Sequence, residues 1–358
     1  MSIANIVRPE IRNLTAYQSA EQMDDTIRLN ANEACWNSDA GQPGISLNRY
    51  PEVRPHELRS RLANWYGVRD ENLLVTRGSS EAIDLLIRSF CRAGQDDIVL
   101  TPPTFDMYRH YADIHGTGIV NVPLDLDKDF AIDCAALIAG CSSASKLVFL
   151  CSPNNPTGRP VPRSTILALL ESRQNQSIVV VDEAYVEFGD AASIAELVNE
   201  YENLAVLRTV SKALALAGTR CGCAIASTEI IDVLDRVMPP YSMPTPAVRH
   251  VVNALAQERL ELAMSNVAGT IAARDALMQS LRELPIVDRV WPSSANFLLV
   301  RFRDAQLVNR VTSDAGILLR QFPGQPELEN CLRITVGSDE EIAALTDVLS
   351  SIRVGANV

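Results

Sequence analysis

Basic residues, long apolar runs and metal-type cysteine spacings are all scarce in this sequence. Lysine and arginine number 32 against 44 aspartates and glutamates, which gives a formal net charge of -12. Binding to nucleic acid or to an anionic membrane depends on clustered basic residues, so the sequence predicts neither partner. An anionic ligand would have to be held by local arginines rather than by the overall field of the protein.

Apolar runs such as 146–150 and 177–181 are far too short to span a bilayer. The N-terminus has no apolar signal core and carries acidic residues early, so neither secretion nor organelle import is indicated. We therefore expect a cytoplasmic protein with no membrane partner.

Eight cysteines and four histidines show no C-x-x-C pair and no spacing typical of a metal site. A disulfide or zinc framework is therefore disfavoured, and no metal is predicted. Cys221 and Cys223 alternate along an expected strand and point to one face, so we interpret both as small buried apolar residues.

Short apolar runs alternate with helical patterns between about residues 56 and 235. The runs that predict strands are 73–76, 97–101, 147–151, 178–182, 205–210 and 221–226. Helical patterns lie between the first of them, notably at 80–91 and 163–173. This alternation is typical of the α/β class, with a mostly parallel central sheet and helices on both faces.

A proline-rich break, MPPYSMPTPA, precedes the C-terminal region. A long helical pattern then covers about 247–284, followed by the strand-like NFLLVRF, GILLRQF and CLRITVG. The chain is longer than one hydrophobic core usually supports. We expect a large α/β domain over 46–245, a smaller α+β domain over 246–358, and an N-terminal segment, 1–45, that packs on the small domain.

One lysine, Lys212, lies in RTVSKALALAGTRCG, where a strand is expected to give way to a helix. A lysine in that position is usually a solvated surface residue. Its neighbours change this interpretation, because ligands of open α/β sheets bind at the carboxyl edge of the strands. The side chains expected at the same edge are Asp182 and Tyr185 after IVVVD, Asn155 in CSPNNPTG, and Arg220.

These side chains could together hold pyridoxal phosphate. Lys212 would form the Schiff base with the cofactor aldehyde and later move a proton, which an arginine could not do because its pKa is too high. Asp182 would face the ring nitrogen and keep it protonated. Tyr185 and Asn155 would donate hydrogen bonds to the phenolate oxygen of the ring, although either could be merely a packed aromatic or a turn residue.

The cofactor phosphate would bind where LVTRGSSEAIDLLI passes from strand to helix. Ser79 and Ser80 lie at the expected helix start, where free N–H groups and the helix dipole attract an anion. Arg220, with the hydroxyls of Thr209 and Ser211, could complete the site. Taken alone, a G-S-S-E turn is mostly a helix cap.

Nine motifs together resemble the histidinol-phosphate aminotransferase family, whose members have fold type I. They are LNANE, NRYP, TRGSSEAIDLLIRSF, PPTFDMY, CSPNNPTG, VVVDEAYVEF, RTVSKALALAGTRCG, ILLRQF and CLRITVG. The resemblance covers nearly the whole chain. It implies pyridoxal 5'-phosphate as cofactor and transamination between L-histidinol phosphate and 2-oxoglutarate, giving imidazole-acetol phosphate and L-glutamate, in histidine biosynthesis. It also implies a homodimer with its sites at the subunit interface, and we expect the N-terminal segment, 1–45, to pack on the dimer partner as well as on the small domain.

The resemblance also implies roles for residues outside the edge described above. Phe105 would stack on the pyridine ring, although from its position alone it would be interpreted as core. Tyr50 would reach the cofactor phosphate of the partner subunit, and Arg333 matches the arginine that binds the substrate carboxylate. The substrate-binding residues implied in this way are Tyr17, Asn32, Tyr50, Asn155, Arg320 and Arg333.

Three alternatives remain open. L-threonine-O-3-phosphate decarboxylases and aromatic aminotransferases share the fold, and the bond that breaks depends on an alignment against the ring that a sequence does not show. A non-catalytic regulatory protein that binds pyridoxal phosphate is the alternative of another class. It is disfavoured, because a protein that only binds has no need of a Schiff-base lysine.

Overall fold

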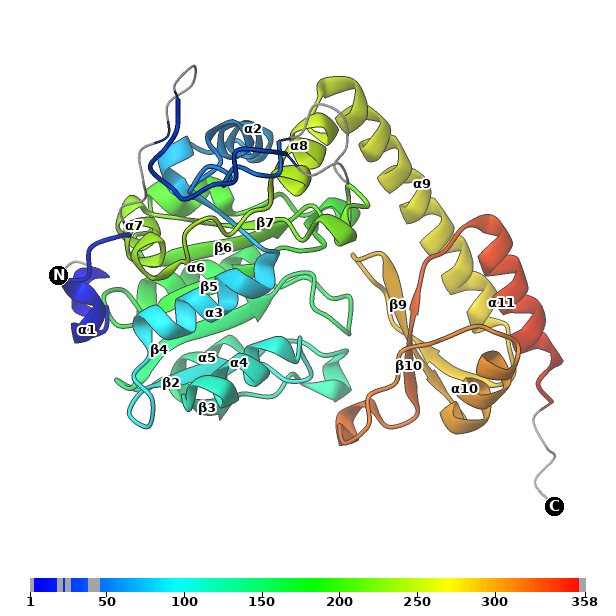
Figure 1. Cartoon of the computed structure of the whole chain (residues 1–358). Coiled ribbons are helices and arrows are strands. Elements are labelled where there is room, and N and C mark those ends of the chain that lie inside the picture. Colours follow the sequence, from blue (N-terminus) through cyan, green and yellow to red (C-terminus); the bar gives the residue numbers. More distant parts are fainter. Residues whose placement is uncertain (1–2, 18–21, 23–26, 38–45, 354–358) are drawn as a thin grey trace.

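The computed structural model describes residues 3–17, 22, 27–37 and 46–353, which form two adjoining parts (Figure 1). In this described portion, the larger part contains a seven-stranded sheet and the smaller part a three-stranded sheet. The predicted fold class, a mostly parallel α/β sheet with a smaller α+β unit, is confirmed. None of the helices described is long and apolar enough to cross a membrane.

The large sheet has the strand order β1-β7-β6-β5-β4-β2-β3. Its strands are β1 (Leu73–Thr76), β2 (Asp97–Leu100), β3 (Gly118–Asn121), β4 (Ser145–Cys151), β5 (Ile178–Asp182), β6 (Leu204–Thr209) and β7 (Gly222–Ala226). All pairs from β6 to β3 are parallel, whereas β7 is antiparallel to both of its neighbours. Every residue of β5 is buried, as a continuous apolar run in a central strand requires.

All six strands predicted for the large sheet are present, with small differences at their ends. The edge strand β3 was not predicted. Its sequence, GIVN, is short and none of its residues is buried, so it lacks the continuous apolar character of the inner strands.

Helices cover both faces of the large sheet. They are α1 (Pro9–Arg12), α2 (His56–Tyr66), α3 (Ser79–Phe90), α4 (Met107–His115), α5 (Cys134–Gly140), α6 (Arg163–Ser172), α7 (Thr228–Val237) and α8 (Thr245–Ala254). One apolar cluster joins α3, α4 and α7 to one face, and a second joins α2, α5, α6 and α8 to the other. The predicted helices at 80–91 and 163–173 correspond to α3 and α6.

The single long helix predicted over 247–284 is wrong, because the chain forms α8 and then α9 (Gln257–Arg282). Val251 and Leu255 pack in the core of the large part, whereas Leu277 and Leu281 near the end of α9 pack in the core of the small part. The chain must turn between these two cores, and neither glycine nor proline marks the turn. Helix α8 therefore packs on the large part, and α9 leads from it to the small part.

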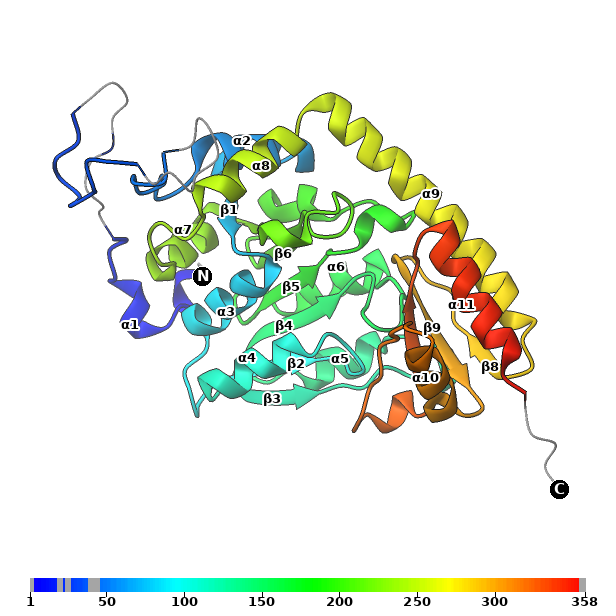
Figure 2. The ribbon, with the colours of Figure 1, turned by 45° about the vertical axis from the view of Figure 1, so that its right-hand side comes forward.

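The small part consists of β8 (Val287–Val290), β9 (Phe297–Phe302), β10 (Cys331–Thr335), α10 (Ala305–Asp314) and α11 (Asp339–Ser351). The strands are antiparallel in the order β10-β9-β8, and α9 runs beside α11 (Figure 2). The expected strand GILLRQF is absent from the described structure; this segment makes only an isolated bridge between Arg320 and Arg333.

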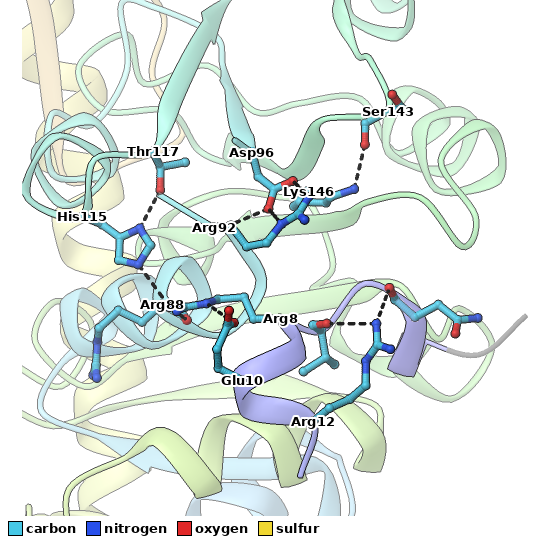
Figure 3. Close-up of polar contacts among 12 residues, drawn as sticks. Arg8, Glu10, Arg12, Arg88, Arg92, Asp96, His115, Thr117, Ser143 and Lys146 are labelled. Carbon is cyan, nitrogen blue, oxygen red and sulfur yellow. Dashed lines mark hydrogen bonds and ion pairs between the residues drawn. The ribbon is translucent and has the colours of Figure 1, made fainter. Parts of the chain in front are cut away.

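The first described residues pack on the large part, unlike the expectation for the segment 1–45. Ile3, Ile6 and Val7 are buried in the core formed by α3, α4 and α7. Arg8 donates to the carbonyl oxygen of Arg88 at 2.9 Å, and its Nη1 lies 3.4 Å from His115 Nε2 (Figure 3). Residues 1–2, 18–21, 23–26 and 38–45 of this segment lie outside the described residues.

Candidate active site

A cavity of about 200 Å³ lies where β4, β5 and β6 end. The strand register places Cys151, the last residue of β4, beside Asp182, the last residue of β5. The predicted cofactor-binding residues that line this cavity are Ser79, Ser80, Phe105, Asn155, Asp182, Tyr185, Thr209, Ser211, Lys212 and Arg220. The parallel strands therefore bring together side chains that are far apart in the sequence, as the edge rule for open sheets leads us to expect.

Asp182 is a buried carboxylate, with 2% of its surface exposed. Its Oδ2 accepts a hydrogen bond from the Tyr108 hydroxyl at 2.8 Å, and its Oδ1 accepts one from the Ala184 N–H at 3.1 Å. Burial raises the pKa of Asp182 to about 6, against the lowering effects of these hydrogen bonds and of Lys212. A cation bound in the cavity beside this carboxylate, such as a protonated ring nitrogen, would stabilise its charged form.

Lys212 follows β6, and its Nζ lies 5.7 Å from the centroid of the Tyr185 ring. Burial lowers the pKa of Lys212, and the positive charges of Arg333 and Arg220 lower it further. A lowered pKa increases the fraction of neutral amine, which is the form that attacks an aldehyde and accepts a proton.

The first turn of α3 lies close against the segment that enters β7. Gly78, at φ 75°, precedes the helix. A Cβ on Gly222 would lie 2.6 Å from the backbone nitrogen of Ser79, and a Cβ on Gly78 would lie 2.8 Å from Nη2 of Arg220. Only glycines permit this approach, which brings a guanidinium to the N–H groups of a helix start.

The hydroxyls of Thr209 and Ser211 line the cavity together with Ser79, Ser80 and Arg220, and we call this group the phosphate cradle. The Thr209 hydroxyl donates to Ser211 Oγ at 2.9 Å, and the Ser211 N–H donates to Thr209 Oγ1 at 3.1 Å. The cradle thus combines a helix N-terminus, hydroxyls and Arg220, a set of donors that suits a phosphate group. The residues present fit pyridoxal phosphate at both its ring and its phosphate.

Arg333, on β10 of the small part, does not line the cavity itself but contacts Asn155, which does. Its Nη1 donates a hydrogen bond to Asn155 Oδ1, and its guanidinium lies 5.2 Å from the ring centroid of Phe297. Since the carbonyl oxygen of Asn155 accepts from Arg333, the amide NH2 remains to donate elsewhere. Burial raises the pKa of the Tyr185 hydroxyl, so this group stays protonated and can also donate.

The structure does not bring every predicted residue to the cavity. Tyr17 and Tyr50 are 61% and 51% exposed, and neither lines it. Tyr50 stacks on Tyr241, with ring centroids 4.8 Å apart. Asn32, at φ 54°, also lies outside the lining. Arg320 is exposed and meets Arg333 only through backbone hydrogen bonds of 3.0 and 3.2 Å.

Two supporting features were missed from the sequence. Tyr108 is fully buried and donates a hydrogen bond to Asp182. It lies in the motif PPTFDMY, in which the resemblance to the family implies a role for Phe105 alone. Arg208, at the end of β6, pairs with Glu187 at 2.5 Å and with Glu183 at 3.4 Å. The signal in the sequence for this cluster of three charges is the unusual charge content of two buried strand ends, VVVDEAYVEF and LRT. The cluster ties the end of β6 to the chain that follows Asp182.

The chain is similar to known proteins over nearly its whole length. The family model for aminotransferase class I and II matches residues 17–349. A histidinol-phosphate aminotransferase of Aeromonas salmonicida is 46% identical over 351 residues, covering 98% of both chains. That of Escherichia coli is 40% identical over 356 residues, covering 99% of both.

Among solved structures, the chain resembles the histidinol-phosphate aminotransferase from Sinorhizobium meliloti in complex with pyridoxal-5'-phosphate. The TM-score is 0.77 at 24% identity, and the match covers 85% of this chain and 82% of that chain. At this identity the likeness concerns the fold alone.

Proposed function

The chain belongs to the class I and II aminotransferase family, and we propose that it transfers an amino group between L-histidinol phosphate and 2-oxoglutarate. The products are imidazole-acetol phosphate and L-glutamate, and the pathway is L-histidine biosynthesis. The observation that carries the proposal is the cavity: Lys212, the buried Asp182 and the Arg220 cradle line one space, in a chain 46% identical to a histidinol-phosphate aminotransferase.

Pyridoxal phosphate is the cofactor of this family; when bound, it withdraws electrons from the substrate Cα and makes the Cα proton transferable. Lys212 would hold it through its aldehyde, and Asp182 through its ring nitrogen. Phe105 would pack on the ring face, while Tyr185 and Asn155 donate to the ring oxygen. The residues proposed to hold its phosphate are Ser79, Ser80, Thr209, Ser211 and Arg220, with Tyr50 of a partner subunit.

Lys212 is the proposed acid and base. Its Nζ, neutral once it has released the cofactor, would take the proton from the substrate Cα and deliver it to the former aldehyde carbon, C4′, of the cofactor. The lowered pKa of Lys212 in the cavity supports this role. Asp182 would keep the ring nitrogen protonated throughout, because among the described residues its charge is otherwise stabilised only by the two hydrogen bonds and by Lys212.

Arg333 is the proposed anchor for the anionic end of both substrates, the phosphate of histidinol phosphate or a carboxylate of 2-oxoglutarate. A guanidinium binds either group through two parallel hydrogen bonds. Its contact with Asn155 places this charge beside the cavity. Arg320, Tyr17, Asn32 and Tyr50 are proposed to complete the substrate site.

We further propose a homodimer formed through the N-terminal segment. Large apolar side chains of this segment are exposed in the single chain: Ile27 at 90%, Leu29 at 90% and Trp36 at 72%. Such a concentration of exposed apolar surface is typical of an interface. Covering it with a second subunit could also bring Tyr50 to the partner's phosphate cradle. We also propose that the chain divides into a large domain, 46–245, and a small domain, 246–358, whose first helix, α8, packs on the large domain. We propose a cytoplasmic location as well.

The test is to incubate the protein, loaded with pyridoxal phosphate, with histidinol phosphate and 2-oxoglutarate and to measure glutamate. Formation of glutamate and imidazole-acetol phosphate, lost in Lys212→Arg, is the expected result. Release of carbon dioxide from threonine phosphate without glutamate exchange would instead favour a decarboxylase. A protein that binds no pyridoxal phosphate under any condition would contradict both enzymatic functions.

A further inference from the structure

Tyr108 supplies the only side-chain hydrogen bond that Asp182 accepts from the described residues. The Tyr108 hydroxyl lies 2.8 Å from Asp182 Oδ2. Tyr108 is part of α4, whereas Asp182 ends β5 and Lys212 follows β6. A carboxylate can accept about four hydrogen bonds, so two of the accepting positions remain for a ligand in the cavity.

Aromatic packing holds Tyr108 in this position. Its side chain is fully buried in the first turn of α4. Its ring stacks on Phe149 with centroids 4.8 Å apart and meets the edge of Phe105 at 5.5 Å and 88°. Phe105 itself lines the cavity. Tyr108 therefore contacts both Asp182 and Phe105, the two side chains that are proposed to contact the cofactor ring.

The hydroxyl of Tyr108 acts as a donor. Burial raises its pKa well above the ordinary value, so the proton stays on the oxygen. The titratable or charged groups near Asp182 are Tyr108 from α4, Cys151 from β4, Lys212 after β6, and Tyr185. Of these, only Tyr108 forms a hydrogen bond with the Asp182 carboxylate.

We propose that Tyr108 is a positioning residue for cofactor binding: it orients Asp182 and favours its ionised form, so that the carboxylate can pair with a protonated ring nitrogen. The hydrogen bond fixes Oδ2 and stabilises negative charge in a site that burial makes unfavourable for charge. This inference rests on the proposed use of pyridoxal phosphate and adds a residue to that function.

The decisive experiment is a double-mutant cycle on cofactor affinity, measured as the dissociation constant of pyridoxal phosphate for the full-length protein freed of cofactor. Tyr108→Phe keeps the aromatic packing and deletes only the hydroxyl. Loss of one hydrogen bond to a charged group predicts about tenfold weaker binding. In the Asp182→Asn background the same change should alter the dissociation constant less than about twofold, since Tyr108 acts through the carboxylate.

Tyr201→Phe is the matched control, because Tyr201 packs on the opposite face of the sheet. It should leave the dissociation constant unchanged. Equal losses from Tyr108→Phe in both backgrounds, or no loss in the wild-type background, would overturn the proposal. A Tyr108→Phe protein that does not fold would overturn it too, because the hydroxyl would then be needed for the fold. Failure of the wild-type protein to bind pyridoxal phosphate would instead contradict the proposed function.

Discussion

Arg333 Nη1, on a strand of the small part, donates a hydrogen bond to Asn155 Oδ1, in the loop after β4, although 178 positions separate the two residues. The contact joins the two parts of the molecule at the edge of the cavity. It sets a fixed cation beside the place where the proposed cofactor ring would lie. Several testable properties of the site depend on this arrangement.

The first prediction concerns Arg333→Lys. A lysine cannot form the two parallel hydrogen bonds of a guanidinium, so kcat/KM for both substrates should fall about 10- to 100-fold. The affinity for pyridoxal phosphate should change little. Steady-state kinetics and cofactor titration measure the two effects separately. Arg303→Lys, at an exposed ion pair with Asp288, is the control. An equal loss in both variants would contradict the role of Arg333.

Asp182→Asn should separate stability from activity. The folded pKa of Asp182 is raised to about 6, so its stabilising contribution is fully present below the unfolded value of 3.8 and is lost as pH rises through 6. Above pH 6 the ionised carboxylate therefore destabilises the cofactor-free protein, by at most about 3 kcal/mol. Denaturant unfolding at pH 8 should find Asp182→Asn at least as stable as the wild type, yet inactive. A less stable variant at pH 8 would contradict this reasoning.

Gly222→Ala should damage the phosphate cradle. Its Cβ would lie 2.6 Å from Ser79 N and 2.8 Å from Arg208 O, both backbone atoms that cannot move freely. Overpacking of this kind costs about 1–3 kcal/mol, so both stability and cofactor affinity should fall. Gly218→Ala is the control, because a Cβ there meets no atom of the described chain within 4 Å. Thermal unfolding and cofactor titration of the pair test the close approach; equal behaviour would argue against it.

Leu29→Asp should weaken the proposed dimer. A charge on a side chain that becomes buried between subunits costs several kcal/mol unless it is paired. Sedimentation analysis should therefore show monomers at concentrations where the wild type is dimeric. Leu262→Asp changes an exposed leucine of α9 and should leave the assembly intact. A monomeric wild-type protein would remove the basis of this prediction.

His115, the last residue of α4, provides a second pH dependence. Burial and the neighbouring Arg8 lower the pKa of His115. Its contribution to stability is therefore fully present above the unfolded value of 6.5 and is lost as pH falls through the lower folded value. Between pH 8 and pH 5 the urea midpoint of the wild type should drop more than that of His115→Gln. Equal drops would show that the contact does not influence folding.

The central strands could be predicted because each is a short apolar run. The residues that follow them could be predicted because the carboxyl ends of parallel strands meet at one edge of the sheet. Asp182 and Lys212 follow from that rule, whereas Arg220 reaches the same edge because it precedes β7, which is antiparallel to β6. The link between Tyr108 and Asp182 could not be predicted, because it depends on how α4 sits against β5. The break between α8 and α9 has no glycine or proline to mark it, so only the positions of the two cores explain it.

The central claim is the amino-group transfer, and a half-reaction tests it most directly. The protein loaded with pyridoxal phosphate is mixed with histidinol phosphate alone while its visible absorbance is followed. We predict that the band is lost with formation of imidazole-acetol phosphate, that 2-oxoglutarate restores it with formation of glutamate, and that phenylalanine, tyrosine and threonine phosphate react more slowly. An absorbance band unaffected by histidinol phosphate, or a faster reaction with one of the other amines, would contradict the account.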